Sequence, residues 1–194
     1  MLFPDFDNQV PVKISAKMMR LRFNGCDPDY ILTTCHGACC RSPSSPTGVM
    51  VTIHPSEIFK IAAYGVKVVD QFVQPRPGEH QCPFQHNETH LCNLHTTPDK
   101  PFGCIASPFT INKNGTMVVR HRYISLKCYN DGKKIPAYKA FRASLDLIFG
   151  KEEATRIVTK LDEGANDFVA RMSADSYEKL KSNDVAKKRL LKRQ

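Results

Sequence analysis

Eight cysteines, all within residues 26–128, are the side chains of this chain best suited to chemistry. Their thiolates are soft ligands that bind zinc and build iron–sulfur clusters. Cys35 and Cys39 have a C-x3-C spacing typical of zinc knuckles, and Gly37 between them gives the turn its backbone freedom. Cys40 follows Cys39 directly. A disulfide between these neighbours would be strained, and their side chains point in different directions, so they would serve two separate metals or two irons of one cluster.

A second set of cysteines, Cys82, Cys92 and Cys104, lies beside turn-forming residues, with Cys26 and Cys128 on its flanks. The loop that carries this set also holds three histidines that are candidate ligands: His86, His90 and His95. A bound metal would explain how so irregular a loop is held in place, because the free energy of ligation contributes directly to folding.

Whether these cysteines form disulfides or bind metal depends on the redox state of the compartment in which the protein is expected. The N-terminal residues are interrupted by Pro and Asp where a signal peptide needs a continuous apolar stretch, and no run of about 18 apolar residues could span a membrane. We therefore expect a cytoplasmic protein, in which cysteines stay reduced and bind metal. The expected cofactor is zinc or iron, the latter also as an iron–sulfur cluster. The predicted metal ligands are all eight thiols: Cys26, Cys35, Cys39, Cys40, Cys82, Cys92, Cys104 and Cys128.

Short elements must position these cysteines. The alternation of apolar residues over 49–53 predicts a strand, and residues 54–57 predict a helix start with Pro in the first position and a capping-box Glu. Gly65 is suited to end that helix. Residues 74–100 show little periodicity and predict a long loop, whereas an Asn-Gly turn within 109–119 predicts a β-hairpin.

The residues after Cys128 contain neither Cys nor His and have the apolar spacing of helices. The predicted helical segments are 136–150, 152–161, 168–172 and 177–180. We therefore predict an α+β protein: a small, irregular, metal-stabilised cysteine-cluster domain with short strands and a helix, followed by a helical C-terminal segment. The predicted division places the cysteine-cluster domain at 1–132 and a basic helical segment at 133–194.

The formal net charge of +9 is concentrated in the second of these segments. Residues 133–194 carry 15 Lys and Arg against 9 Asp and Glu, whereas residues 1–132 carry 13 against 10. Besides metal ions, the expected partners are therefore a protein bound through the helical tail or, as an alternative, a nucleic acid. No membrane association is expected.

The cysteine region resembles the YkgJ-like cysteine-cluster proteins, a bacterial family described as a zinc- or iron-chelating domain. The resemblance covers about residues 26–132 and rests on motifs in the family's order: Gly37–Arg41, Cys82–Phe84, Cys92, Lys100–Cys104 and Cys128 with Gly132. Many members have C-x2-C-G-x-C-C at the front, which would put a cysteine where His36 stands. Cys26, Cys35 and His36 are thus alternative occupants of the family's first ligand positions.

Three functions are consistent with these observations. The first is a metal-binding cysteine-cluster protein, because no P-loop, dinucleotide-binding glycine pattern, HExxH or nucleophile elbow is present. The second is an iron–sulfur-dependent protein-modifying enzyme, since related domains occur in flagellin lysine methylases; Glu57, His86 and His90 would be its acid–base candidates. The third is a zinc-knuckle nucleic-acid-binding protein, with Arg120, Arg122 and Tyr123 on an expected strand facing the nucleic acid.

Overall fold

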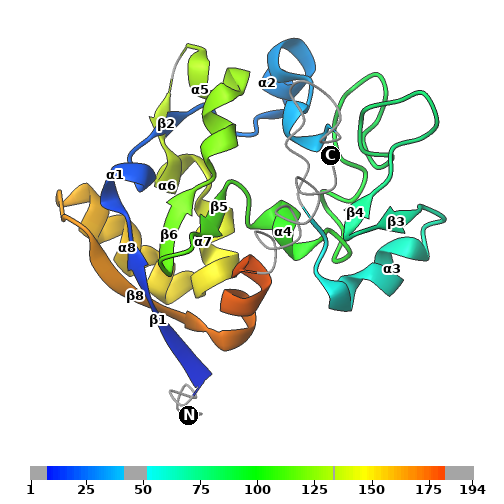
Figure 1. Ribbon diagram of the computed structural model, residues 1–194. Helices are drawn as coiled ribbons and strands as arrows, with labels where there is room; N and C mark the ends of the chain where they lie inside the picture. Colours follow the sequence, from blue (N-terminus) through cyan, green and yellow to red (C-terminus); the bar gives the residue numbers. More distant parts are fainter. Residues whose placement is uncertain (1–7, 42–51, 133, 182–194) are drawn as a thin grey trace.

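The computed structural model describes residues 8–41, 52–132 and 134–181, which form a larger lobe and a smaller lobe joined near α4 (Figure 1). Helices and strands are mixed along the chain, as the predicted α+β class requires. The strands are β1 (Gln9–Ile14), β2 (Arg22–Phe23), β3 (Val68–Val69), β4 (Phe72–Val73), β5 (Phe109–Ile111), β6 (Thr116–Val119), β7 (Ile135–Pro136) and β8 (Phe168–Ser173). The α-helices are α1 (Ala16–Met19), α2 (Pro28–Tyr30), α3 (Ile58–Ala62), α4 (Phe102–Ile105), α5 (Lys127–Asn130), α6 (Ala137–Ala140), α7 (Arg142–Phe149) and α8 (Lys151–Asp162).

The described residues also form a helix over 174–181 and four short helical turns that are tighter or wider than an α-helix. One is the π-helix η2 (Ile31–Cys35), and three are 3-10 helices: η3 (Ala38–Cys40), η4 (Pro55–Glu57) and η5 (His121–Ser125).

A four-stranded sheet in the order β5-β6-β1-β8 forms the centre of the larger lobe, and α7 and α8 pack beside it (Figure 1). β1 runs parallel to β6 and antiparallel to β8, with six residue pairs from Gln9–Ser173 to Ile14–Phe168. Val12 and Ile14 of β1 are buried, as are Ala170 and Met172 of β8.

The strand β8 corrects one prediction, because the segment at 168–172 was expected to be helical. Ala170 and Met172 are buried, whereas the preceding residue Val169 is 57% exposed. This alternation is the two-residue period of a half-buried strand. The reason is tertiary: β1 offers this segment a full set of backbone partners that local sequence does not reveal.

The helices after residue 136 are otherwise close to expectation. The expected helix 136–150 is two helices, α6 and α7, because Phe141 between them has φ −119° and ψ 40°, outside the helical range. Gly150 ends α7 in a left-handed φ of +79°, and α8 then begins with two acidic residues in its first turn.

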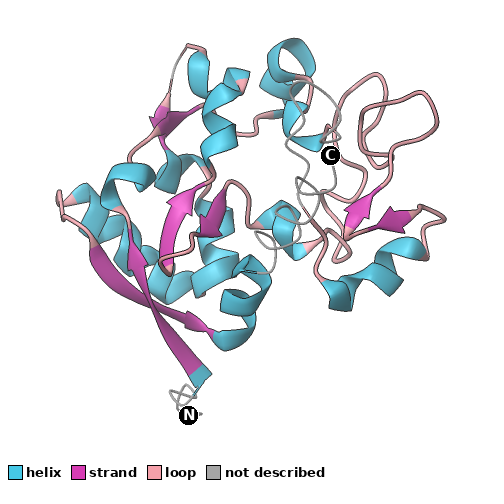
Figure 2. Ribbon diagram, viewed as in Figure 1, coloured by secondary structure: helices cyan, strands magenta, loops and turns pink. Residues whose placement is uncertain are grey.

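The smaller lobe has its own small core of Ile53, Ile61, Val73, Phe84 and Leu94. It contains α3, the β3-β4 pair and a long irregular loop that runs from β4 to α4 (Figure 2).

Three local predictions for this region and the hairpin are confirmed. The loop over 74–100 has only turns and single bridges. His54 caps η4, with Glu57 completing the capping box. β5 and β6 form the expected hairpin. Of the strand predicted over 49–53, residues 49–51 lie outside the described residues, and the other two are not in a strand.

The predicted division at residue 132 stays a prediction. In the described residues, strands from before this point and helices from after it share one hydrophobic core, including Phe109, Met117, Leu145 and Ile157. Within the same part of the chain, no helix is long and apolar enough to cross a membrane.

Candidate metal centre

Four of the eight cysteines line one pocket of about 40 Å³ in the larger lobe: Cys26, Cys35, Cys39 and Cys128. Apolar and aromatic side chains make up much of the remaining wall, among them Tyr30, Tyr123 and Phe141. Cys39 and Cys128 pack against the larger core from its edge. We call these four thiols the first cysteine group.

Hydrogen bonds between distant segments bring this group together. The Asn24 backbone amide donates to the Cys128 carbonyl at 2.8 Å, which holds the chain before Cys26 against α5. The Lys127 ammonium donates to the Thr34 carbonyl at 3.2 Å and so ties η2 to the same helix. Asp27 caps α2 by accepting from two backbone amides, and α2 leads directly into η2 and Cys35.

The other four cysteines form a second group on the side of the smaller lobe: Cys40, Cys82, Cys92 and Cys104. The Cys82 amide donates to the Cys40 carbonyl at 2.8 Å, and a single β-bridge joins Cys92 to Gln85. Cys82 and Cys92 pack against the small core, while Cys104 lies on α4, where the two lobes meet.

Cys39 and Cys40 stand at the border of the two groups, with their Sγ atoms 4.0 Å apart. Cys39 lines the pocket of the first group, whereas the charges felt by Cys40 come from Cys82, Cys104 and Cys92. The charge of Cys39 also raises the pKa of Cys82, Cys92 and Cys104, so Cys39 lies next to both groups.

The pKa of each of the eight thiols is raised above its ordinary value. Burial raises the pKa of Cys26 to about 12, and the charges of Cys39 and Cys35 add to the effect. Although Cys26 as a residue is exposed, its thiol faces the pocket. Burial likewise raises the pKa of Cys128 to about 12.

The pKa values of the thiols in the second group are raised as well. Burial raises the pKa of Cys82 to about 11 and shifts the pKa of Cys104 further upward. A hydrogen bond with Cys39 lowers the pKa of Cys40, but burial and the charges of its group outweigh it. Crowded, buried thiols of this kind are the donor set that a zinc ion or an iron–sulfur cluster needs, because the cation offsets the charge of the thiolates.

The thiols surround a space rather than meet at one point. Within residues 8–41, 52–132 and 134–181, no three Cys, His, Asp or Glu side chains are arranged to hold a single metal ion. By donor chemistry the first group fits a thiolate-bound metal centre. By position, its four thiols border a pocket that exceeds the roughly 10–15 Å³ needed for one water molecule.

His36 does not join either group and turns instead toward His90. The two rings are 4.8 Å apart between centroids in an edge-to-face arrangement, and the Nδ1 atom of each is buried without a hydrogen-bond partner among the described residues. The Gln85 amide donates to the carbonyls of both, at 3.0 and 2.9 Å. Gly37 allows this approach, because a Cβ there would lie 2.0 Å from the Gln85 amide nitrogen.

The other acid–base candidates have structural partners. The Glu57 carboxylate accepts from the amides of His54 and Phe102, at 3.2 and 2.8 Å, so it links η4 to α4. His86 accepts from two backbone amides in its own turn.

The residues predicted to face a nucleic acid are placed otherwise. Arg120 and Tyr123 are only 7% and 4% exposed, and η5 replaces the expected strand. Tyr123 belongs to the larger core and lines the pocket of the first cysteine group. The Arg120 guanidinium donates to the Ser107 hydroxyl at 3.4 Å, and Arg122 is half-buried in η5.

Lys100 is a charged residue near both cysteine groups whose role the cysteine pattern did not predict. Its positive charge lowers the pKa of thiols in both groups, among them Cys26, Cys39, Cys92 and Cys104. Its ammonium also lies 2.8 Å from the Nδ1 atom of His95. The signal in the sequence was its place at the head of the Lys100–Cys104 motif.

The model of one protein family, CxxCxxCC, matches residues 32–135 of this chain, and its description is "Putative zinc- or iron-chelating domain". The matched segment holds seven of the cysteines and leaves Cys26 outside. No curated protein and no solved structure matches the chain significantly. When the final cysteine pair of the family pattern is set on Cys39 and Cys40, Thr33 and His36 occupy its first two cysteine positions.

Proposed function

We infer, from the premise that this chain belongs to the CxxCxxCC family of zinc- or iron-chelating domains, that its function is to hold two metal centres side by side. Each centre would use four thiolates, as iron–sulfur clusters commonly do. The observation that carries this proposal is the division of eight crowded thiols into two groups at adjacent residues, Cys39 and Cys40.

The first centre would be ligated by Cys26, Cys35, Cys39 and Cys128. We assign it to an iron–sulfur cluster, because its four thiols line one pocket with room for more than a single water-sized atom. Its walls are mainly apolar and aromatic, so they would exclude water and protect such a cluster.

The second centre would be ligated by Cys40, Cys82, Cys92 and Cys104. It would fix the long loop of the smaller lobe, where the small core offers few apolar contacts. Lys100, whose charge reaches both groups, would offset part of the negative charge of the thiolates.

Cys26 and Cys35 would replace the two cysteines that the family pattern has at Thr33 and His36. The Thr33 hydroxyl instead donates to the Asp29 carbonyl at 2.7 Å, and His36 faces His90. The wide π-turn η2 and the left-handed backbone of His36, with φ +49°, accompany this change of ligand position.

When bound, the metals would supply positive charge beside the thiolates, and an iron–sulfur cluster would also supply redox capacity. The residues of the chain bind and orient the metals and keep solvent away. No residue is assigned to a chemical step.

The proposal is tested by the matched variants Cys39→Ser and Cys40→Ser, with His36→Ala as control. Iron, zinc and acid-labile sulfide are measured per chain after purification without oxygen. Each serine variant is expected to lose one centre and to keep the metal of the other, because the two thiols belong to different groups. His36→Ala is expected to keep both centres.

Loss of all metal in both serine variants would show a single shared centre. If His36→Ala loses as much metal as Cys39→Ser, then His36 is itself a metal ligand at the family's second cysteine position. Zinc without sulfide in the wild type would overturn the assignment of an iron–sulfur cluster.

A further inference from the structure

A cavity of about 590 Å³ opens on the smaller lobe, beside the second cysteine group. It lies between the turn after α3, the segment after β4 and the long loop. Its wall includes Phe84 and Leu94, which follow closely on Cys82 and Cys92. Its volume falls within the roughly 300–1,000 Å³ of small-molecule sites.

The floor of the cavity is apolar and aromatic. Phe84 and Leu94 belong to the small core and are 9% and 3% exposed. The Tyr64 ring stands edge-on to Phe84, with centroids 5.6 Å apart, and its hydroxyl is hydrogen-bonded to the Asp99 carboxylate. Three prolines in the wall, Pro75, Pro77 and Pro83, limit its backbone motion. A flat apolar group would therefore find a preformed surface here.

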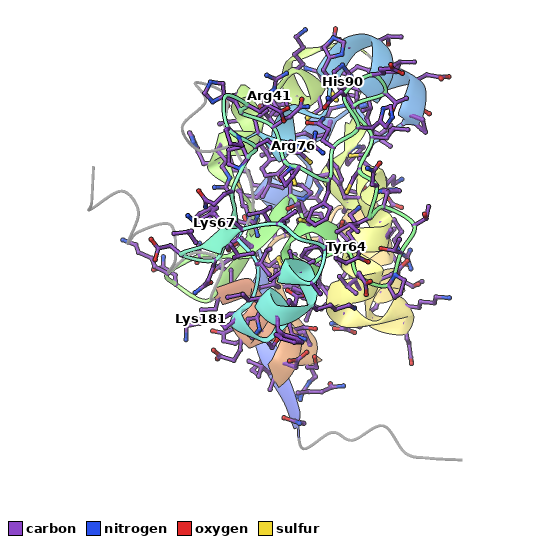
Figure 3. The ribbon with its side chains drawn as sticks, turned by 90° about the vertical axis from the view of Figure 1, so that its right-hand side faces the viewer. Arg41, Tyr64, Lys67, Arg76, His90 and Lys181 are labelled. Carbon is purple, nitrogen blue, oxygen red and sulfur yellow. The ribbon has the colours of Figure 1, made fainter. Side chains whose placement is uncertain are left out.

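The rim of the cavity is positively charged. Lys67 and Arg76 line it and are both exposed, whereas no Asp or Glu is among the described residues of its wall. In Figure 3, Lys67 and Tyr64 lie on opposite sides of this face, with Arg76 above them. The Lys67 ammonium has no partner in the described part of the chain, and Arg76 makes only a 4.0 Å contact to Glu79 and a 3.4 Å hydrogen bond to a carbonyl.

Among the described residues, two carboxylates contact wall residues: Glu79, which lies 4.0 Å from Arg76, and Asp99, which is paired with a lysine. Asp99, which accepts from Tyr64, also pairs with the Lys60 ammonium at 2.5 Å. The side-chain amide of Asn93 on the wall has no partner in the described residues and is free to donate.

We propose that this cavity binds a small aromatic anion, with its ring against Tyr64 and Phe84 and its acidic group between Lys67 and Arg76. Ring contacts would supply apolar burial, and the two cations would select for the charge. Because part of the cavity wall belongs to the loop that the second metal centre would fix, the inference concerns the folded, metal-containing protein; which ligand the cavity binds is tested separately from which metal the cysteines hold.

The test uses isothermal titration of the purified, metal-containing protein with naphthoate and with its uncharged counterpart naphthylmethanol. Naphthoate is expected to bind one molecule per chain and more tightly than naphthylmethanol. In the double variant Lys67→Met/Arg76→Met, naphthoate affinity is expected to fall about tenfold, since exposed charge pairs contribute modestly and two act together. Naphthylmethanol affinity should not change.

Two further variants locate the site. Lys151→Met removes an exposed lysine of α8 that lies outside the cavity and should leave naphthoate binding unchanged. Asn93→Trp fills the cavity from its wall and should abolish binding of both compounds. Equal affinities for the two compounds, a change below about twofold in the double variant, or unaltered binding in Asn93→Trp would overturn the proposal.

Discussion

The neighbouring thiols of Cys39 and Cys40 have different surroundings because both residues lie in the 3-10 turn η3, where successive side chains point about 120° apart. One thiol faces the larger lobe and the other faces the loop of the smaller lobe. Two adjacent cysteines thereby acquire different roles. Because cysteine thiols release protons when they bind metal, metal binding should depend on pH.

Zinc binding to the metal-free protein should release protons and weaken as the pH falls. The pKa values of Cys26 and Cys128 are raised to about 12 and that of Cys82 to about 11, so at neutral pH these thiols are protonated. Since zinc binds thiolates, protons compete with it below these pKa values. Competition with a chromophoric chelator between about pH 6 and pH 8 should show affinity rising with pH. An affinity independent of pH would mean that the thiols are already ionised.

Among the elements, η2 and η3 are connected through Gly37, whose lack of a side chain lets the Gln85 amide reach the His36 carbonyl. Gly65, at the end of the α3 region, has a similar left-handed φ of +76° but no atom within 4 Å of where a Cβ would stand. Substitution of Gly65 therefore introduces backbone strain alone, whereas substitution of Gly37 introduces backbone strain and a steric clash.

We predict that Gly37→Ala lowers the free energy of unfolding by more than Gly65→Ala does. Both variants incur the left-handed strain of about 1 kcal/mol or more, but only at Gly37 would the Cβ meet Gln85 at 2.0 Å and the His90 carbonyl at 2.9 Å. Denaturant unfolding of the two variants measures the difference, and metal analysis should show loss from Gly37→Ala alone. Equal effects would show that the Gln85 contact is unimportant.

The sequence predicted elements whose signals are local. The Asn-Gly turn between β5 and β6 and the His54 cap of η4 depend on neighbouring residues, and both are confirmed. The strand β8 was missed because its partner β1 lies more than 150 residues away. The division of the thiols into groups was unpredictable for the same reason, since Cys26 meets Cys128 only through tertiary contacts such as the Asn24–Cys128 hydrogen bond.

At the scale of the whole molecule, the two lobes differ in how much apolar packing supports them. The sheet and its helices share a large continuous core, whereas the smaller lobe buries five hydrophobic residues in its cluster. Burial of so few side chains contributes little against the entropy of a long loop, so metal ligation would carry much of the stability of that lobe.

Removal of the metal should therefore loosen the smaller lobe first. Hydrogen exchange at the backbone amides of residues 82–95 is expected to speed up after chelation, while amides of β1 and β8 stay protected by their six-pair ladder. Peptide-resolved mass spectrometry before and after chelation measures both regions. Uniform loss of protection would instead indicate one cooperative unit with metal at its centre.

Whether these cysteines hold metal is decided by metal analysis of wild-type protein purified without oxygen. Iron, zinc and acid-labile sulfide are quantified per chain alongside the visible spectrum. We expect stoichiometric metal, with iron and sulfide together in a brown protein whose colour is lost on oxidation or chelation. A protein that folds and holds no stoichiometric metal would contradict it.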